Sequence, residues 1–120
     1  MKTHKLYKEI KHIILAFGYS FAGMRAALNE FAFRLEILVS IIAIPLAFHI
    51  AHNPAELALL IGSLFLVMIV ELLNTAIETT INRISLEIHP LSKKAKDVAS
   101  AAVLLSIINA AIIWLVVLWS

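Results

Sequence analysis

Four polar side chains recur at helical spacing near the end of a long apolar stretch. They are Glu71, Asn74, Glu78 and Asn82, and they lie in or beside the segment VELLNTAIETTIN. On a helix with 3.6 residues per turn these positions fall within a sector of roughly 80°, so they form one polar stripe. A carboxylate near the membrane core costs roughly 2.5 kcal/mol or more and marks a functional site by default. Two such carboxylates need a counter-charge or a metal ion.

The stripe also has a structural interpretation, because Asn and Thr side chains join membrane helices through hydrogen bonds. This alternative stays open for Asn74 and Thr75. It is weaker for the two glutamates, since an ionised pair would remain without compensation.

Two further clusters of charge flank the apolar stretches. Glu30, Arg34 and Glu36 lie in LNEFAFRLE, where Glu30 and Arg34 have the i,i+4 spacing of a surface ion pair. The second cluster is the segment EIHPLSKKAKD, which by itself would be a solvated basic loop. Together with the stripe, the two clusters provide oxygen ligands, mobile cations and a candidate general base.

These residue types suit phosphoryl transfer, in which positioning and charge neutralisation supply most of the catalysis. Carboxylate oxygens without cysteine favour Mg²⁺ over zinc, and lysine offers a point charge for phosphate. With three glycines in the chain, a glycine-rich phosphate loop is excluded. The GYSFAGM segment has the GxxxxG spacing, but Met24 stands where the motif needs Lys.

The composition is that of a membrane protein. Of the 120 residues, 62% are hydrophobic and 15% are charged, and there is no cysteine. The cations lie beside apolar runs and not among stacking aromatic residues, so we expect no binding to nucleic acid. The first apolar patch, Ile13–Phe17, is short for a signal peptide, so we expect the N-terminus to be retained.

The apolar runs predict an all-α fold with three transmembrane helices, at residues 31–51, 55–81 and 95–119 of a single domain, 1–120. Lys and Arg gather before the first span and between the second and third, which places the N-terminus in the cytoplasm. Pro90 suggests a loop from Ser85 to Ser92, with Ser92 as a possible helix cap. Trp114 and Trp119 resemble interfacial anchors.

Residues 5–29 predict an amphipathic helix on the membrane surface. Apolar side chains recur there at helical spacing, and basic side chains fall largely on the opposite face. The apolar positions are Leu6, Ile10, Ile13, Ile14 and Phe17. A frayed basic leader is the alternative.

Nearly the whole chain resembles the small integral-membrane lipid kinases of bacteria, which comprise diacylglycerol kinase and undecaprenol kinase. The resemblance rests on GYSFAGMRAALNEFAFRLE, ELLNTAIETTINRI, EIHPLSKKAKDVASAAVL and the final VLWS. It implies a homotrimer of three-span protomers in the bacterial inner membrane, with sites shared between subunits. The implied reaction transfers the γ-phosphate of Mg-ATP to a lipid hydroxyl.

The resemblance also implies roles for individual residues. Glu71 matches the general base, and Glu30 and Glu78 match the metal-binding carboxylates. The positions that contact ATP are Tyr19, Glu30, Asn74, Glu78, Glu87, His89, Lys96 and Asp97. The positions that line the lipid site are Arg34, Glu36, Glu71, Ser100 and Trp114. Asn82 departs from the pattern, since most relatives have Asp there.

The favoured substrate is diacylglycerol, giving phosphatidic acid, because the GYS, AFR and LWS stretches resemble the diacylglycerol branch. Undecaprenol is the alternative lipid. Two other classes explain less of the sequence. A proton-coupled transporter would use Glu71 but not the lysine cluster, and a non-catalytic assembly protein would use the stripe only to pair helices.

Overall fold

The computed structural model describes all 120 residues, Met1–Ser120, as four helices joined by short connections. They are α1 (Lys2–Ala27), α2 (Phe31–Ile50), α3 (Pro54–Ile84) and α4 (Pro90–Trp119). The helices α2, α3 and α4 are long and apolar enough to cross a membrane. The predicted all-α class with three such helices is confirmed.

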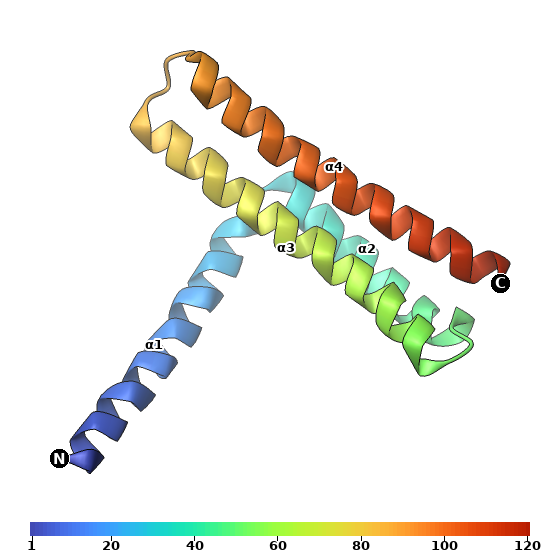
Figure 1. The fold of residues 1–120 in the computed structure, drawn as a ribbon, viewed down its shortest axis with the longest axis horizontal. Helices are drawn as coiled ribbons and strands as arrows, with labels where there is room; N and C mark the ends of the chain where they lie inside the picture. Colours follow the sequence, from blue (N-terminus) through green and yellow to red (C-terminus); the bar gives the residue numbers. More distant parts are fainter.

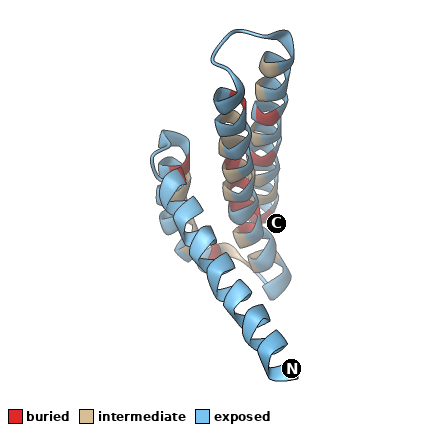
Figure 2. Ribbon diagram, turned by 90° about the vertical axis from the view of Figure 1, so that its left-hand side faces the viewer, coloured by how far each residue is buried: buried red, intermediate tan, exposed pale blue.

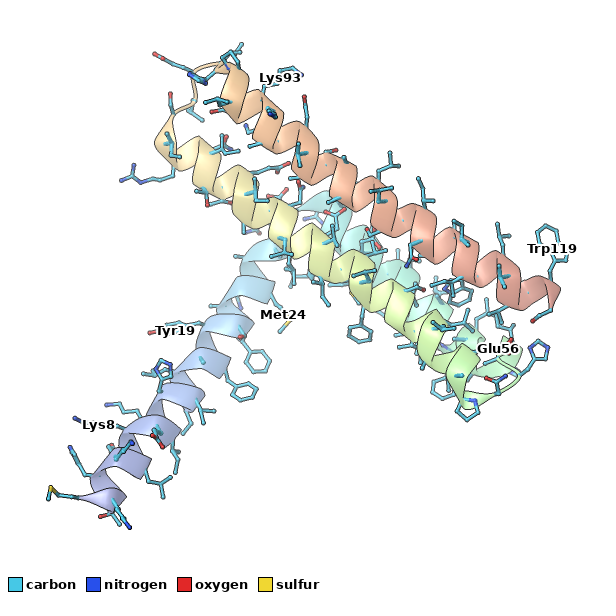
Figure 3. The ribbon with its side chains drawn as sticks, in the orientation of Figure 1. Lys8, Tyr19, Met24, Glu56, Lys93 and Trp119 are labelled. Atoms are coloured by element: carbon cyan, nitrogen blue, oxygen red, sulfur yellow. The ribbon has the colours of Figure 1, made fainter.

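Helix α3 lies at the centre of the arrangement, with α4 antiparallel along one side and α2 along another (Figure 1). The short connection between α2 and α3 requires these two helices to be antiparallel as well. The connection between α3 and α4 and the connection between α2 and α3 therefore lie at opposite ends of the bundle. We call the first the Lys93 end and the second the Glu56 end, after residues labelled in Figure 3.

Two of the long helices begin at a proline that follows a capping residue. Asn53 accepts a hydrogen bond from the backbone N–H of Glu56 at 2.9 Å, and Pro54 opens α3. His89 accepts one from the N–H of Leu91 at 3.1 Å, and Pro90 opens α4. Proline suits the first helical position because its φ is preset and no donor is lost there. Ser92 therefore lies inside α4, and its interpretation as the cap was wrong.

The buried core is small and lies where the long helices face one another. Ala47, Leu60 and Val117 bring α2, α3 and α4 together near the Glu56 end. The indole N–H of Trp114 on α4 donates to Ser63 on α3 at 3.2 Å, and the Ser63 hydroxyl donates to the carbonyl of Leu60. The Trp114 indole and the Ser63 hydroxyl therefore both have partners, which lowers the cost of burying them in an apolar bundle.

Most apolar side chains lie on the outside of the molecule. Only 13 of the 120 residues are buried, and Figure 2 shows them on the inner faces of the helices. So large an exposed apolar surface would be unstable in water, and it needs lipid or other protein around it. The chain is therefore a multi-pass membrane protein.

Helix α1 leaves the bundle at an angle and packs on it only near its C-terminal end (Figures 1 and 2). Ala27 is its one buried residue. In the part of α1 that precedes Ala27, both the apolar and the basic residues are exposed.

Candidate active site

A group of carboxylates lies where the start of α2 meets the second half of α3. Glu71 is 7% exposed and is the one charged residue among the buried residues of the chain. Glu30 and Glu78 lie close enough for their charges to repel that of Glu71, and Glu71 repels Glu36 in turn. The four side chains come from the α1–α2 turn, α2 and α3, so the fold gathers residues distant in the sequence.

The polar stripe continues from Glu71 towards the Lys93 end because α3 is one unbroken helix through Ile84. Asn74 Nδ2 donates to Glu78 Oε1 at 3.3 Å. Asn74 Oδ1 is buried and has no hydrogen-bond partner. A buried amide oxygen without a donor is unusual, and it suits a site where a cation or a ligand donor completes the arrangement.

The loop between α3 and α4 borders a polar hollow of about 340 Å³ at the Lys93 end. Its lining includes Glu87, His89, Lys96 and Asp97. The His89 Nδ1 atom accepts the capping bond from Leu91, so a neutral ring carries its proton on Nε2 and can donate to a ligand. The hollow therefore offers one such donor, lysine ammonium groups and the first turn of α4.

The lysines beside this hollow have different partners. Lys93 Nζ lies 2.6 Å from Asp97 Oδ2, within the same helix. Lys96 Nζ instead donates to Asn82 Oδ1 at 2.9 Å, which joins α4 to α3. Lys96 forms no ion pair within the chain, and its charge stays uncompensated there.

An apolar groove of about 570 Å³ runs along α2, α3 and α4. Eleven of its twelve lining residues are hydrophobic, and the twelfth is Glu36. Leu46 and Trp114 lie further along the groove towards the Glu56 end. Glu36 is the one charged residue of the groove and lies near Glu71, so the shape and chemistry of the groove suit a lipid chain with its polar end at the carboxylates.

Other predicted site residues lie apart from these groups. Tyr19 is 73% exposed and projects from α1 on the same side as Lys8 (Figure 3), and it lines none of these groups. Ser100 is exposed on α4. Arg34 Nη1 donates to the carbonyl of Leu28 at 2.9 Å and forms no ion pair with Glu30, so it closes the α1–α2 turn.

The group around Glu71 and Glu78 offers oxygen ligands for a metal ion, but it does not supply a complete set of ligands. No three acidic or histidine side chains of the chain are grouped closely enough to enclose a metal. Glu78, Glu30 and the unpaired Asn74 Oδ1 are hard oxygen donors, which suit Mg²⁺ with its remaining ligands from water and phosphate. The residues therefore fit such an ion only together with a bound phosphate.

Two residues with a place in this geometry had no assigned role in the sequence analysis. Asn82 was part of the stripe, but its bond to Lys96 depends on how the α3–α4 hairpin closes. Ser63 carries no signal in the sequence, since a lone serine in an apolar run does not reveal its partner.

Three spanning helices, a buried carboxylate with acidic neighbours and a basic hollow at one end define a membrane enzyme that handles a polar group at the bilayer boundary. Comparison with known sequences identifies the group of enzymes. The sequence profile of the family described as "Prokaryotic diacylglycerol kinase" matches residues 18–118. The chain belongs to this family.

Curated relatives in several bacteria cover most of this chain. The protein named diacylglycerol kinase in Escherichia coli (strain K12) is 50% identical over 90% of this chain and 89% of its own length. The one in Pseudomonas aeruginosa is 46% identical over 91% of this chain and 89% of its own length. The one in Helicobacter pylori (strain ATCC 700392 / 26695) is 41% identical over 89% of this chain and 84% of its own length.

Proposed function

We propose that this chain is a membrane-embedded diacylglycerol kinase that transfers the γ-phosphate of ATP to the lipid hydroxyl and forms phosphatidic acid. The observation that carries the proposal is the burial of Glu71 near three further carboxylates, beside an apolar groove that Glu36 lines. The family and the names of its relatives support a kinase that acts on this lipid.

Glu71 is the general base in this proposal. The lipid hydroxyl donates a hydrogen bond to its carboxylate, and the oxygen attacks the γ-phosphorus as its proton passes to Glu71. The bond from the γ-phosphorus to the bridging oxygen breaks, and ADP leaves with the electron pair. Positioned proton transfer of this kind contributes roughly 10²- to 10⁴-fold to the rate. A buried site also excludes water as a competing phosphate acceptor.

The nucleotide lies between the polar stripe and the hollow at the Lys93 end. His89 and Lys96 donate to phosphate oxygens there, and Glu87 and Asp97 accept from the nucleoside. Glu78, held by Asn74, faces the phosphates together with Glu30. These two carboxylates and Asn74 Oδ1 would hold Mg²⁺, which would neutralise charge on the transferred phosphoryl group.

The lipid occupies the apolar groove with its glycerol end at Glu36 and Glu71. Arg34, Ser100 and Trp114 border the lipid as it enters and lies along the helices. Because Trp114 is hydrogen-bonded to Ser63, its ring is fixed against the groove and forms a firm wall.

The working form is a homotrimer with sites shared between subunits. Tyr19 is exposed on α1 and does not line the hollow of its own protomer, and the outer faces of α2, α3 and α4 are apolar. A neighbouring subunit would cover such faces and bring the α1 of one chain to the α3–α4 loop of another. The α1 helix then lies on the inner face of the membrane, with the basic N-terminus in the cytoplasm where ATP is.

A kinase assay in lipid vesicles tests the proposal. The purified chain receives labelled ATP and either diacylglycerol or undecaprenol, with Mg²⁺ or with excess chelator. We expect labelled phosphatidic acid that forms only with Mg²⁺. Labelling of undecaprenol alone would make the chain an undecaprenol kinase, and proton-driven export of a dye from vesicles without ATP would favour a transporter.

A further inference from the structure

We infer that Asn82 is a positioning residue that aims Lys96 at the phosphates of the nucleotide and leaves its charge available. The inference rests on the proposed function, since it assigns a role within the nucleotide site. Neither the stripe nor the basic loop predicts this pairing, because the two residues are fourteen positions apart in the sequence.

The geometry points to positioning because the contact crosses the helix hairpin where the hollow lies. Asn82 belongs to the last turn of α3, and Lys96 follows the first turn of α4. Their hydrogen bond of 2.9 Å is the one side-chain bond that joins these two helices at the Lys93 end. The other bonds between the two helices, from Trp114 to Ser63 and from the final Ser120 to Glu56, belong to the opposite half of the bundle.

A free lysine side chain has four rotatable bonds, and holding it in one conformation costs rotamer entropy. The bond to Asn82 fixes Lys96 before the nucleotide arrives, so binding does not have to order it. Because Lys96 lines the hollow, the fixed ammonium group lies beside the space that we assign to the nucleotide.

The chemistry of the partner determines how much charge remains. An amide oxygen is neutral, so it engages one of the three N–H donors of Lys96 and cancels none of the positive charge. A carboxylate at the same place would form an ion pair, as Asp97 does with Lys93 at 2.6 Å. Of the two lysines that line the hollow, Lys96 is therefore the one whose side chain is held by a neutral partner and whose positive charge is not compensated.

The test is a set of variants of the full chain in lipid vesicles, with the KM for Mg-ATP and kcat measured at saturating lipid. Asn82→Ala should raise the KM about tenfold and leave kcat within about twofold, since a hydrogen bond to a charged donor is lost from nucleotide binding. Asn82→Gln retains a neutral acceptor and should restore the KM to within about twofold of the parent value.

Two further variants separate positioning from a structural role. In a Lys96→Ala background, Asn82→Ala should have no additional effect, because it acts only through Lys96. Asn82→Asp should raise the KM at low salt, and the difference from the parent should shrink at high salt as the ion pair is screened. Thr80→Ala is the control, since the Thr80 hydroxyl bonds only to the carbonyl of Ala76 within the same helix end.

The outcomes distinguish this inference from the proposed function. If the parent protein phosphorylates no lipid, the proposed function fails and the inference fails with it. If the parent is active and Asn82→Ala has the same KM, or lowers kcat at an unchanged KM, only the inference is overturned. Equal effects of Asn82→Ala with and without Lys96 would also overturn it, because the residue would then act through the fold.

Discussion

The side-chain amide of Asn74 donates a hydrogen bond from Nδ2 to Glu78 Oε1 at 3.3 Å, while Asn74 Oδ1 lies buried without a partner. The two residues are one helical turn apart on α3, so the contact is set by the backbone and does not depend on the rest of the bundle. The amide thus orients one carboxylate oxygen of Glu78 and leaves a second oxygen ligand beside it. Both oxygens belong to the part of the stripe where we place Mg²⁺.

The contact leads to a prediction about metal dependence. Asn74→Ala should raise the Mg²⁺ concentration needed for half-maximal activity about 10- to 100-fold, as the loss of a residue that orients a metal ligand does in other sites. The measurement is a Mg²⁺ titration of the vesicle kinase assay at fixed ATP. Thr79→Ala, which removes only an exposed hydroxyl bonded to the carbonyl of Thr75, should leave the titration unchanged. A parent-like titration for Asn74→Ala would remove Asn74 from the metal site.

Glu71 gives a prediction about turnover. Glu71→Gln keeps the shape of the buried side chain and removes its capacity to take a proton, so kcat should fall about 10²- to 10⁴-fold. The fold should be kept, because an amide is less costly to bury than a charge. The measurements are kcat in vesicles and the oligomeric state in detergent.

The matched control for Glu71 is Glu9→Gln, an exposed carboxylate on α1. It should retain the activity of the parent. If Glu71→Gln kept full turnover, the stripe would serve only to pair helices, and another base would have to be sought.

The polar stripe could be predicted from the sequence because it depends on helical periodicity alone. Residues 71, 74, 78 and 82 share a face of any continuous helix, and α3 is continuous across them. The class of fold followed from the length and composition of the apolar runs, which are also properties of single segments. These features are local, or depend on the contrast between lipid and water.

Features that depend on contacts between helices could not be predicted in this way. Trp114 resembled an interfacial anchor, yet its indole N–H is bonded to Ser63 within the bundle, and Trp119 is the tryptophan that lies exposed at the helix end. The pairing of Asn82 with Lys96 likewise requires the hairpin geometry. His89 was missed as the cap of α4 because Pro90 suggests a loop as readily as a first helical turn.

The cap at the start of α3 leads to a prediction about stability. Asn53→Ala removes the acceptor for the N–H of Glu56 and should destabilise the protein by about 1 kcal/mol. Asn53→Ser supplies a capping hydroxyl and should retain most of that stability. Thermal unfolding in detergent measures both, and the kinase KM values should not change because the cap lies at the Glu56 end, far from the hollow (Figure 3). Equal stability of Asn53→Ala and the parent would show that the loop needs no cap.

The hydrogen bond between Trp114 and Ser63 leads to a prediction about how α3 and α4 are held together around the groove. The Ser63 hydroxyl is buried and also donates to Leu60, so Ser63→Ala leaves the indole N–H without a partner in an apolar interface. Trp114→Phe removes the donor and keeps an aromatic ring against the groove. In a double-mutant cycle of the free energy of unfolding in bicelles, the coupling between the two positions should be about 0.6 kcal/mol, the usual size for a hydrogen bond between membrane helices.

Ser106→Ala is the control, since the Ser106 hydroxyl bonds within α4 to the carbonyl of Val103 and should show no coupling to Trp114. A coupling energy of zero for Ser63 and Trp114 would mean that packing alone joins the helices there. A measurable coupling, with weaker binding of long-chain diacylglycerol by Ser63→Ala than by Ser106→Ala, would link the fixed indole to the wall of the groove.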